Sequence, residues 1–321
     1  MTRDAQIAGF LAEAGHGTAR RVPLAGDASA RRYERIVTDI GDSLILMDAD
    51  PATGEDTRAF LDIRAHLFRY GFSAPAVFAE DTQAGLLLLE DFGDDVFARV
   101  MDRDPSRERP LYRLAADCLS RLHEKPLPEG MLPMDAPALA AMIEPAFSHY
   151  APECSDLLPD AVTAFTEALQ PVTEVQPVLA LRDFHAENMV LLSGRHGDRQ
   201  VGLLDFQDAF VTHPAYDLVS MLQDARRDLS DGVEEETLGY FITTTKTDDA
   251  AFRHAYAALG AQRNLRILGV FSRLAKARGK PQYLALQPRV WRHVWQNLQH
   301  PALHRLRDVL GSLPAPETGE T

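Results

Sequence analysis

The sequence predicts an α+β protein with a small β-rich N-terminal lobe and a large, mostly helical C-terminal lobe. Short β-prone runs separated by turn residues crowd into residues 18–90. After Gly93, apolar residues recur at helical spacing. The chain has 321 residues, of which 45% are hydrophobic and 25% charged, and this is ample for a globular core without disulfides or metals. We therefore expect a boundary that separates residues 1–92 from residues 93–321.

The N-terminal lobe is expected to contain one antiparallel sheet of four or five strands and one inserted helix. A first helix is predicted over residues 5–15, where a mixed apolar and polar pattern ends at glycines. Strands are predicted over 22–24, 33–37 and 43–47, and the last two form a hairpin across 38–42. The inserted helix covers 55–70, because Phe60, Ile63 and Leu67 share one helical face. Residues 77–79 and 86–89 supply the remaining strands.

The C-terminal lobe is expected to be helical apart from two brief strands. Those strands, over residues 178–181 and 201–204, flank a polar loop. Four prolines between residues 126 and 137 interrupt the helical pattern. Helices are predicted over residues 111–122, 161–169, 215–226, 234–245, 249–278 and 282–298.

Charge and composition exclude several classes of protein. The chain has 33 basic and 47 acidic residues and a formal net charge of −14, which disfavours a general nucleic-acid binder. The longest strongly apolar run is the four leucines at 86–89, far below the ~20 residues of a membrane span. The two cysteines have no metal-ligand spacing, and low cysteine use is typical of a reducing compartment. We expect a cytoplasmic protein with no nucleic-acid, membrane or obligatory protein partner.

Two acidic loops carry the strongest chemical signal. Asp183 follows an apolar strand, Asn188 comes five positions later, and Asp205 stands before Phe206 at the next strand end. This D-x-x-x-x-N … D-F spacing is typical of protein-kinase catalytic machinery. A carboxylate can take the proton of an acceptor hydroxyl, and Mg²⁺ on the phosphates needs hard oxygen ligands. We predict Asp183 as the base and Asn188 and Asp205 as metal ligands; the alternative is that they cap helices and turns.

The same loop resembles the aminoglycoside phosphotransferase/choline kinase family, whose motif reads H-x-D-x-H-x-x-N and is followed by a D-F/W/Y strand end. Asp183, His185 and Asn188 match it, and Leu181 replaces the first histidine. The resemblance implies a protein-kinase-like fold of two lobes, with a nucleotide-binding N-terminal lobe and a C-terminal lobe that contains the catalytic loop, metal site and acceptor site. It also implies ATP and Mg²⁺ as cofactors. His185 is expected to orient the loop, with a direct role in proton transfer as the alternative.

Flanking segments resemble one branch of this family, the anomeric kinases of N-acetylmuramate and N-acetylglucosamine, over about residues 5–310. The resemblance implies a small amino-sugar substrate, a sugar 1-phosphate product and a place in peptidoglycan recycling. The segments that resemble this branch are residues 26–33, 46–51, 205–209, 216–220, 262–265 and 279–284.

The nucleotide is expected to contact three places in the N-terminal lobe. Backbone N–H groups of the turn at 26–29 can point at phosphate oxygens. The end of the four-leucine strand resembles the inter-lobe hinge of kinases, which implies that its backbone groups pair with adenine. The strand at 44–48 lacks the lysine that kinases use to grip phosphates, so we hypothesise that Arg31 or Arg32, on opposite faces of their strand, replaces it. The predicted nucleotide-binding residues are Gly26, Asp27, Ala28, Ser29, Arg31, Arg32, Leu89, Glu90 and Asp91.

The acceptor site is less well defined by the sequence. Asp208 either faces the sugar hydroxyls or caps a helix. Arg263 and Arg266 lie on the helix predicted over 249–278, and either could bind the lactyl carboxylate of N-acetylmuramate or form an ordinary ion pair. We assign Asp183, Asp208 and Arg263 as substrate residues. Asp217 resembles a family aspartate that braces the catalytic loop.

Two other functions are compatible with the sequence. One is a kinase of another small hydroxyl compound, such as an aminoglycoside, choline or homoserine. The other is a nucleotide-binding pseudokinase that works as an interaction module. The missing strand lysine supports the pseudokinase, whereas intact Asp183, Asn188 and Asp205 argue against it.

Overall fold

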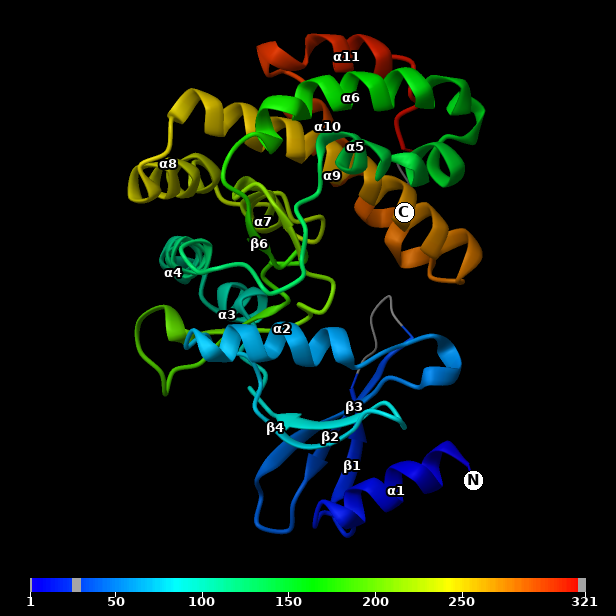
Figure 1. The fold of residues 1–321 in the computed structure, drawn as a ribbon, viewed down its shortest axis with the longest axis vertical. Helices are drawn as coiled ribbons and strands as arrows, with labels where there is room; N and C mark the ends of the chain where they lie inside the picture. Colours follow the sequence, from blue (N-terminus) through cyan, green and yellow to red (C-terminus); the bar gives the residue numbers. More distant parts are fainter. Residues whose placement is uncertain (1, 25–29, 317–321) are drawn as a thin grey trace. The chain divides into compact units, whose positions relative to one another are not determined.

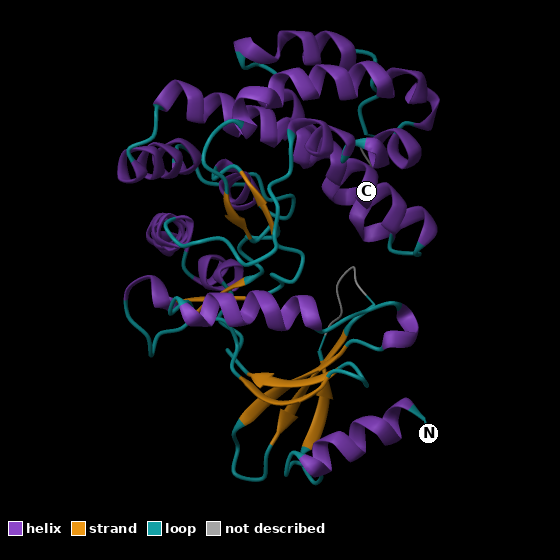
Figure 2. Cartoon of the chain, viewed as in Figure 1, coloured by secondary structure: helices purple, strands orange, loops and turns teal. Residues whose placement is uncertain are grey.

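The computed structural model describes residues 2–24 and 30–316, so the predicted phosphate-covering turn Gly26, Asp27, Ala28 and Ser29 lies outside the described residues. The chain forms two compact units. The first contains residues Met1–Pro105 and Glu187–Asp208, and the second contains Ser106–Ala186 and Ala209–Thr321. The first unit holds the large β-sheet, and the second is mostly helical (Figure 2). The first unit therefore extends past residue 92. The boundary between two lobes that the sequence predicts at that residue stays a prediction.

A five-stranded antiparallel sheet forms the centre of the first unit, in the order β1-β2-β3-β5-β4. The hairpin predicted across residues 38–42 is present, because the Thr38 N–H donates to the Asp42 carbonyl at 2.9 Å. The prediction of one antiparallel sheet of four or five strands is confirmed. The strands are β1 (Arg20–Pro23), β2 (Arg32–Val37), β3 (Ser43–Asp48), β4 (Val77–Asp81) and β5 (Leu86–Glu90).

Helices α1 (Arg3–Glu13) and α2 (Arg58–Arg69) lie on opposite sides of this sheet (Figure 1). Side chains alternate between the two faces of a strand. Ile36 and Leu46 pack against α1, and so mark the α1 face of the sheet. Tyr33 and Met47, paired across β2 and β3, are at alternate positions and therefore belong to the opposite face.

Backbone hydrogen bonds join residues 187–208 to the N-terminal part of the first unit. The N–H of Leu203 donates to the carbonyl of Ser73 at 2.8 Å, and Leu191 donates to Asp95 at 2.8 Å. These long-range bonds place the predicted metal residues in the β-rich unit. The elements concerned are α3 (Phe97–Arg103), β7 (Met189–Leu191), the 3₁₀ turns Pro51–Thr53 and Gly197–Gln200, and β8 (Val201–Leu203).

The long helix α9 (Asp249–Ala277) organises the second unit, where it contacts α6, α7 and α10 (Figure 1). Two glycines allow this close packing: a Cβ on Gly269 would lie 2.0 Å from the Pro145 carbonyl carbon, and one on Gly260 would meet Asn297 at 2.6 Å. The other helices are α4 (Glu108–His123), α5 (Ala136–Ala141), α6 (Leu158–Thr173), α7 (Ala215–Leu222), α8 (Val233–Thr245), α10 (Gln287–Asn297) and α11 (His304–Leu310). Strands β6 (Val178–Ala180) and β9 (Phe210–Thr212) pair antiparallel.

Some predicted boundaries were wrong for identifiable reasons. The helix predicted over 282–298 is a 3₁₀ segment, Pro281–Leu286, followed by α10, because a proline in the first turn of α10 starts a new helix there. The helix predicted from residue 215 ends at Leu222 rather than 226. Helices α3, α5 and α11 are short and were not predicted. In the described part of the chain, no helix combines the length and apolarity needed to cross a membrane.

Candidate functional site

The loop that contains Asp183 is held by Asp217, which lies in the first turn of α7 and is fully buried. Its two carboxylate oxygens accept backbone N–H groups from Leu181 at 2.6 Å and Arg182 at 2.9 Å. Burial raises the pKa of Asp217 to about 7. Arg182 has a left-handed backbone, with φ of 73°, a conformation that persists only where its surroundings hold it. The predicted brace is confirmed, and it acts through the backbone of Arg182.

Asp183 keeps 37% of its side chain exposed while one oxygen faces a buried arginine. The Arg263 Nη2 atom lies 3.5 Å from Asp183 Oδ1, and the same atom donates to Ser220 Oγ at 2.8 Å. Arg263 is only 6% exposed, so it can hold the Asp183 carboxylate in a fixed orientation. These contacts favour a positioning role for Arg263 over the predicted substrate contact.

His185 is buried, and its ring contacts the guanidinium of Arg226. The Arg226 Nη1 atom lies 3.2 Å from His185 Nε2. Burial, which is the largest cause, lowers the pKa of His185 to about 4, so the ring is neutral at pH 7. Because a guanidinium can only donate, Nε2 accepts and the ring proton sits on Nδ1. A buried neutral ring supports the loop-orienting role and disfavours proton transfer.

The two predicted metal ligands come together in the first unit. Asn188 Nδ2 lies 3.4 Å from Asp205 Oδ2, and the Leu204 N–H donates to the Asn188 carbonyl at 3.0 Å. Gln207 Nε2 donates to Asp205 Oδ1 at 2.8 Å. Asp205 has a left-handed backbone, with φ of 56°. Mg²⁺ usually takes one or two carboxylates from the protein and the rest of its ligands from water and phosphate, so this donor pair fits it.

A ring stack that the sequence did not reveal connects helix α2 to the Asp205 loop. The rings of Phe60 and Phe206 are stacked, with centroids 5.0 Å apart and planes at 19°. Phe206 is fully buried. The only sequence signal was the position of Phe60 on the apolar face of its helix, which does not name a partner. The stack couples the position of α2 to the residue next to Asp205.

Arg31 and Arg32 occupy different environments, as their alternation predicted. Arg32 is 64% exposed and its guanidinium bonds Asp48 at 2.6 Å. The side chain of Arg31 is only 8% exposed and lies 3.3 Å from Glu55. Burial raises the pKa of Tyr33 to about 12, and the charges of Arg31 and Asp205 both act on its hydroxyl. Arg31 and Asp205 therefore both lie near the Tyr33 hydroxyl.

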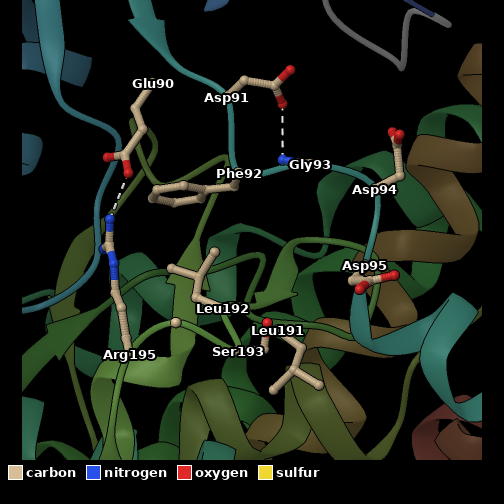
Figure 3. Close-up of a pocket in the computed structure, with 11 residues that line it drawn as sticks. Glu90, Asp91, Phe92, Gly93, Asp94, Asp95, Leu191, Leu192, Ser193 and Arg195 are labelled. Carbon is tan, nitrogen blue, oxygen red and sulfur yellow. Dashed lines mark hydrogen bonds and ion pairs between the residues drawn. The ribbon is translucent and has the colours of Figure 1, made fainter. Parts of the chain in front are cut away.

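Residues at the end of β5 line a cavity of about 370 Å³ between the segments 90–95 and 191–195 (Figure 3). Glu90 bonds Arg195 at 2.5 Å, and Asp91 accepts the Gly93 N–H at 2.8 Å. The Glu90 N–H already donates to the Ala76 carbonyl at 2.8 Å. Leu89 is 3% exposed and pairs on both sides within the sheet. The predicted adenine contact is therefore favoured most at Asp91, which follows the end of the strand.

The predicted residues divide between the two units. Asp208 is exposed in the turn after β8 and is the last residue of the first unit. The predicted catalytic loop passes from the second unit to the first between Ala186 and Glu187. The first unit thus contains Arg31, Arg32, Leu89, Glu90, Asp91, Asn188, Asp205 and Asp208, and the second contains Asp183, His185 and Arg263.

Removal of the brace under the catalytic loop should destabilise the protein. In Asp217→Ala, one buried and one part-buried N–H group lose their acceptor, which costs about 1–3 kcal/mol each and is partly offset by relief of the buried charge. We expect a fall of about 2–4 kcal/mol in the free energy of unfolding, measured with urea. Asp217→Asn keeps one acceptor oxygen and should lose about half as much. Equal stability of the alanine variant and the wild type would exclude the brace.

Comparison with known proteins gives consistent results. A family model described as "Phosphotransferase enzyme family" matches residues 20–253. A relative named N-acetylmuramate/N-acetylglucosamine kinase, from Caulobacter vibrioides, is 36% identical, and the match covers 95% of each chain. A protein of the same name from Pseudomonas aeruginosa is 29% identical over 92% of this chain and 89% of that protein.

Solved structures share the fold at low identity. A choline/ethanolamine kinase family protein from Mesorhizobium loti superposes with a TM-score of 0.64 at 15% identity, over 96% of this chain and 99% of that chain. The gentamicin complex of APH(2'')-IIa gives 0.63 at 15% identity, over 94% and 98%. The predicted protein-kinase-like α+β fold is confirmed. With the family model spanning most of its length, the chain belongs to the phosphotransferase enzyme family, as its catalytic loop predicts.

Proposed function

We propose that the protein is an ATP- and Mg²⁺-dependent kinase that phosphorylates the anomeric hydroxyl of N-acetylmuramate, N-acetylglucosamine or both. The product is the sugar 1-phosphate, and the reaction belongs to peptidoglycan recycling. The observation that carries the proposal is the similarity to the Caulobacter vibrioides kinase over 95% of both chains. The braced, half-exposed Asp183 and the Asn188–Asp205 pair support it, because a pseudokinase would not need to keep them.

The acceptor half of the reaction depends on Asp183. Its half-exposed carboxylate accepts a hydrogen bond from the anomeric hydroxyl. It takes the proton as the hydroxyl oxygen bonds to the γ-phosphorus of ATP and the bond from that phosphorus to the departing ADP breaks. Arg263 and Asp217 act on this group only through position: one fixes the carboxylate and the other fixes the backbone before it. Phosphoryl transfer requires little covalent chemistry from the protein, so this positioning is the main contribution of the loop.

The donor half depends on residues of the first unit. Asn188 and Asp205 would hold Mg²⁺ through oxygen atoms, and the ion would neutralise charge on the phosphates. Asp205 is held for this role by Gln207 and by the stack next to it. We assign Arg31 as the cation that replaces the missing strand lysine, because it shares the face of Tyr33 and the neighbourhood of Asp205.

The proposed function is tested by ADP release from ATP and Mg²⁺ with five acceptors in parallel. These are N-acetylmuramate, N-acetylglucosamine, glucose, kanamycin and choline. We expect turnover on the two acetylated sugars alone, and phosphorus NMR should place the new phosphate on C1. Turnover only on kanamycin or choline would assign the protein to another class of small-molecule kinase. ATP binding without turnover on any acceptor would favour the pseudokinase.

The assignment of the phosphate-binding cation gives a paired prediction. Arg31→Ala removes a charge-assisted hydrogen bond to a phosphate, worth about 1.5–3 kcal/mol, and should raise the KM for ATP roughly 10- to 100-fold. Arg32→Ala should raise it less than about threefold, because Arg32 is exposed and pairs with Asp48. Arg31→Lys should recover part of the loss. Equal effects of the two alanine variants on the KM for ATP would contradict the assignment.

A further inference from the structure

A second arginine on α9 lies one turn from the residue that positions Asp183. Arg263 and Arg266 are three positions apart, a spacing that puts both on one helical face. Arg263 is occupied by Ser220 and Asp183. Arg266 is half-buried and forms no hydrogen bond or ion pair with any residue in the described ranges 2–24 and 30–316. The helix thus presents a guanidinium without a protein partner next to the predicted acceptor site.

The surroundings of Arg266 disfavour its charge. Burial lowers the pKa of Arg266, and the positive charges of Arg182 and Arg263 lower it further. Tyr216 and Asp183 act in the opposite direction, but Asp183 already faces Arg263 and is needed for the acceptor hydroxyl. A cation that is partly removed from water and surrounded by other cations gains strongly from an anion. This local excess of positive charge contrasts with the net charge of −14 on the whole chain.

A buried hydroxyl adds a second unsatisfied group near Arg266. Tyr216 is fully buried, its ring packs edge-on against Phe210 at 4.8 Å, and it interacts electrostatically with Arg266. Its hydroxyl has no hydrogen-bond partner among the described residues. Buried polar groups in folded proteins almost always find a partner, so an unsatisfied hydroxyl beside an unpaired guanidinium indicates that a further polar group belongs here.

We propose that Arg266 forms a subsite for a carboxylate carried by the acceptor sugar. The matching group is the lactyl carboxylate of N-acetylmuramate, which N-acetylglucosamine lacks. A planar guanidinium can bind a carboxylate through two parallel hydrogen bonds, which gives direction as well as strength. The subsite rests on the proposed function, and it makes Arg266 the residue that separates acidic from neutral amino sugars while Asp183 serves both.

The test compares the two sugars on the wild type, Arg266→Gln and Arg266→Lys. We expect Arg266→Gln to raise the KM for N-acetylmuramate roughly 10- to 100-fold and to change the KM for N-acetylglucosamine less than about twofold. Arg266→Lys keeps the charge without the two-pronged geometry and should fall between. Arg273→Gln removes an exposed arginine from the same helix and should leave both KM values unchanged.

The ratio of kcat/KM for the two sugars is the decisive quantity, because a loss of folded protein lowers both values equally. An equal change for both sugars, or no change for either, would overturn the subsite. Calorimetric binding of each sugar separates this inference from the proposed function. Tighter binding of N-acetylmuramate that Arg266→Gln abolishes supports the subsite even if no phosphate is transferred. Equal binding of the two sugars to the wild type rejects the subsite, whatever the turnover.

Discussion

Replacement of Asp183 by asparagine is expected to lower kcat on an acetylated amino sugar by roughly 10²- to 10⁴-fold, the usual contribution of a general base. Asparagine has nearly the same shape and can still accept a hydrogen bond from the acceptor hydroxyl, but it cannot take the proton. The KM for ATP should change little, because the predicted nucleotide residues belong to the other unit of the chain. Steady-state ADP release over a range of both substrates measures the two effects separately.

Glu187→Gln is the matched control for Asp183→Asn. Glu187 lies four residues later in the same motif, is exposed and has no role in the proposed chemistry. It should keep kcat within about twofold of the wild type. Thermal unfolding of both variants verifies that the fold is retained. If Asp183→Asn keeps more than a tenth of the wild-type kcat, Asp183 is not the base, and the half-exposed carboxylate serves only to bind the sugar.

Local pattern sufficed to predict the sheet and the principal helices. The β2–β3 hairpin is defined by alternation on either side of a polar turn, and α2 by one apolar face. The inclusion of residues 187–208 in the first unit was not predictable in this way. It depends on contacts such as the bond from Leu203 to Ser73, which joins residues far apart in sequence. Short helices such as α5 have too few turns to show a period.

The candidate site likewise contains residues that the sequence predicts and contacts that it does not. Asp183, Asn188 and Asp205 were predictable, because their chemistry depends on residue type and spacing at strand ends. The choice between Arg31 and Arg32 was not, because it depends on which arginine meets Asp48 across the sheet. The contact of Arg263 with Ser220 likewise depends on how α9 packs against α7. Sequence gives the chemistry of a side chain, whereas its partner follows from tertiary packing.

Acid should destabilise the protein between pH 6.5 and 4, because four histidines of the second unit are buried or half-buried and together outweigh the opposite effect of Asp217, whose pKa is raised. Burial lowers the pKa of His123 to about 3 and those of His185, His213 and His293 to about 4. Below pH 6.5 the unfolded chain binds protons that the folded chain excludes. Stability is therefore complete above pH 6.5 and falls between pH 6.5 and 4, by up to about 1.4 kcal/mol per pH unit for each histidine. Urea unfolding at half-unit steps of pH measures this slope.

Replacement of His123 isolates one of these histidines. Both its ring nitrogens are buried with no hydrogen-bond partner among the described residues, and its ring meets Phe241 edge-on at 5.9 Å. Phenylalanine keeps this packing and removes the titrating group, so His123→Phe should exceed the wild type in unfolding free energy by about 2 kcal/mol more at pH 5 than at pH 7. The exposed His196→Gln should not change the slope. An unaltered dependence of unfolding free energy on pH in His123→Phe would contradict this prediction. It would mean that His123 has the same pKa in the folded and in the unfolded chain.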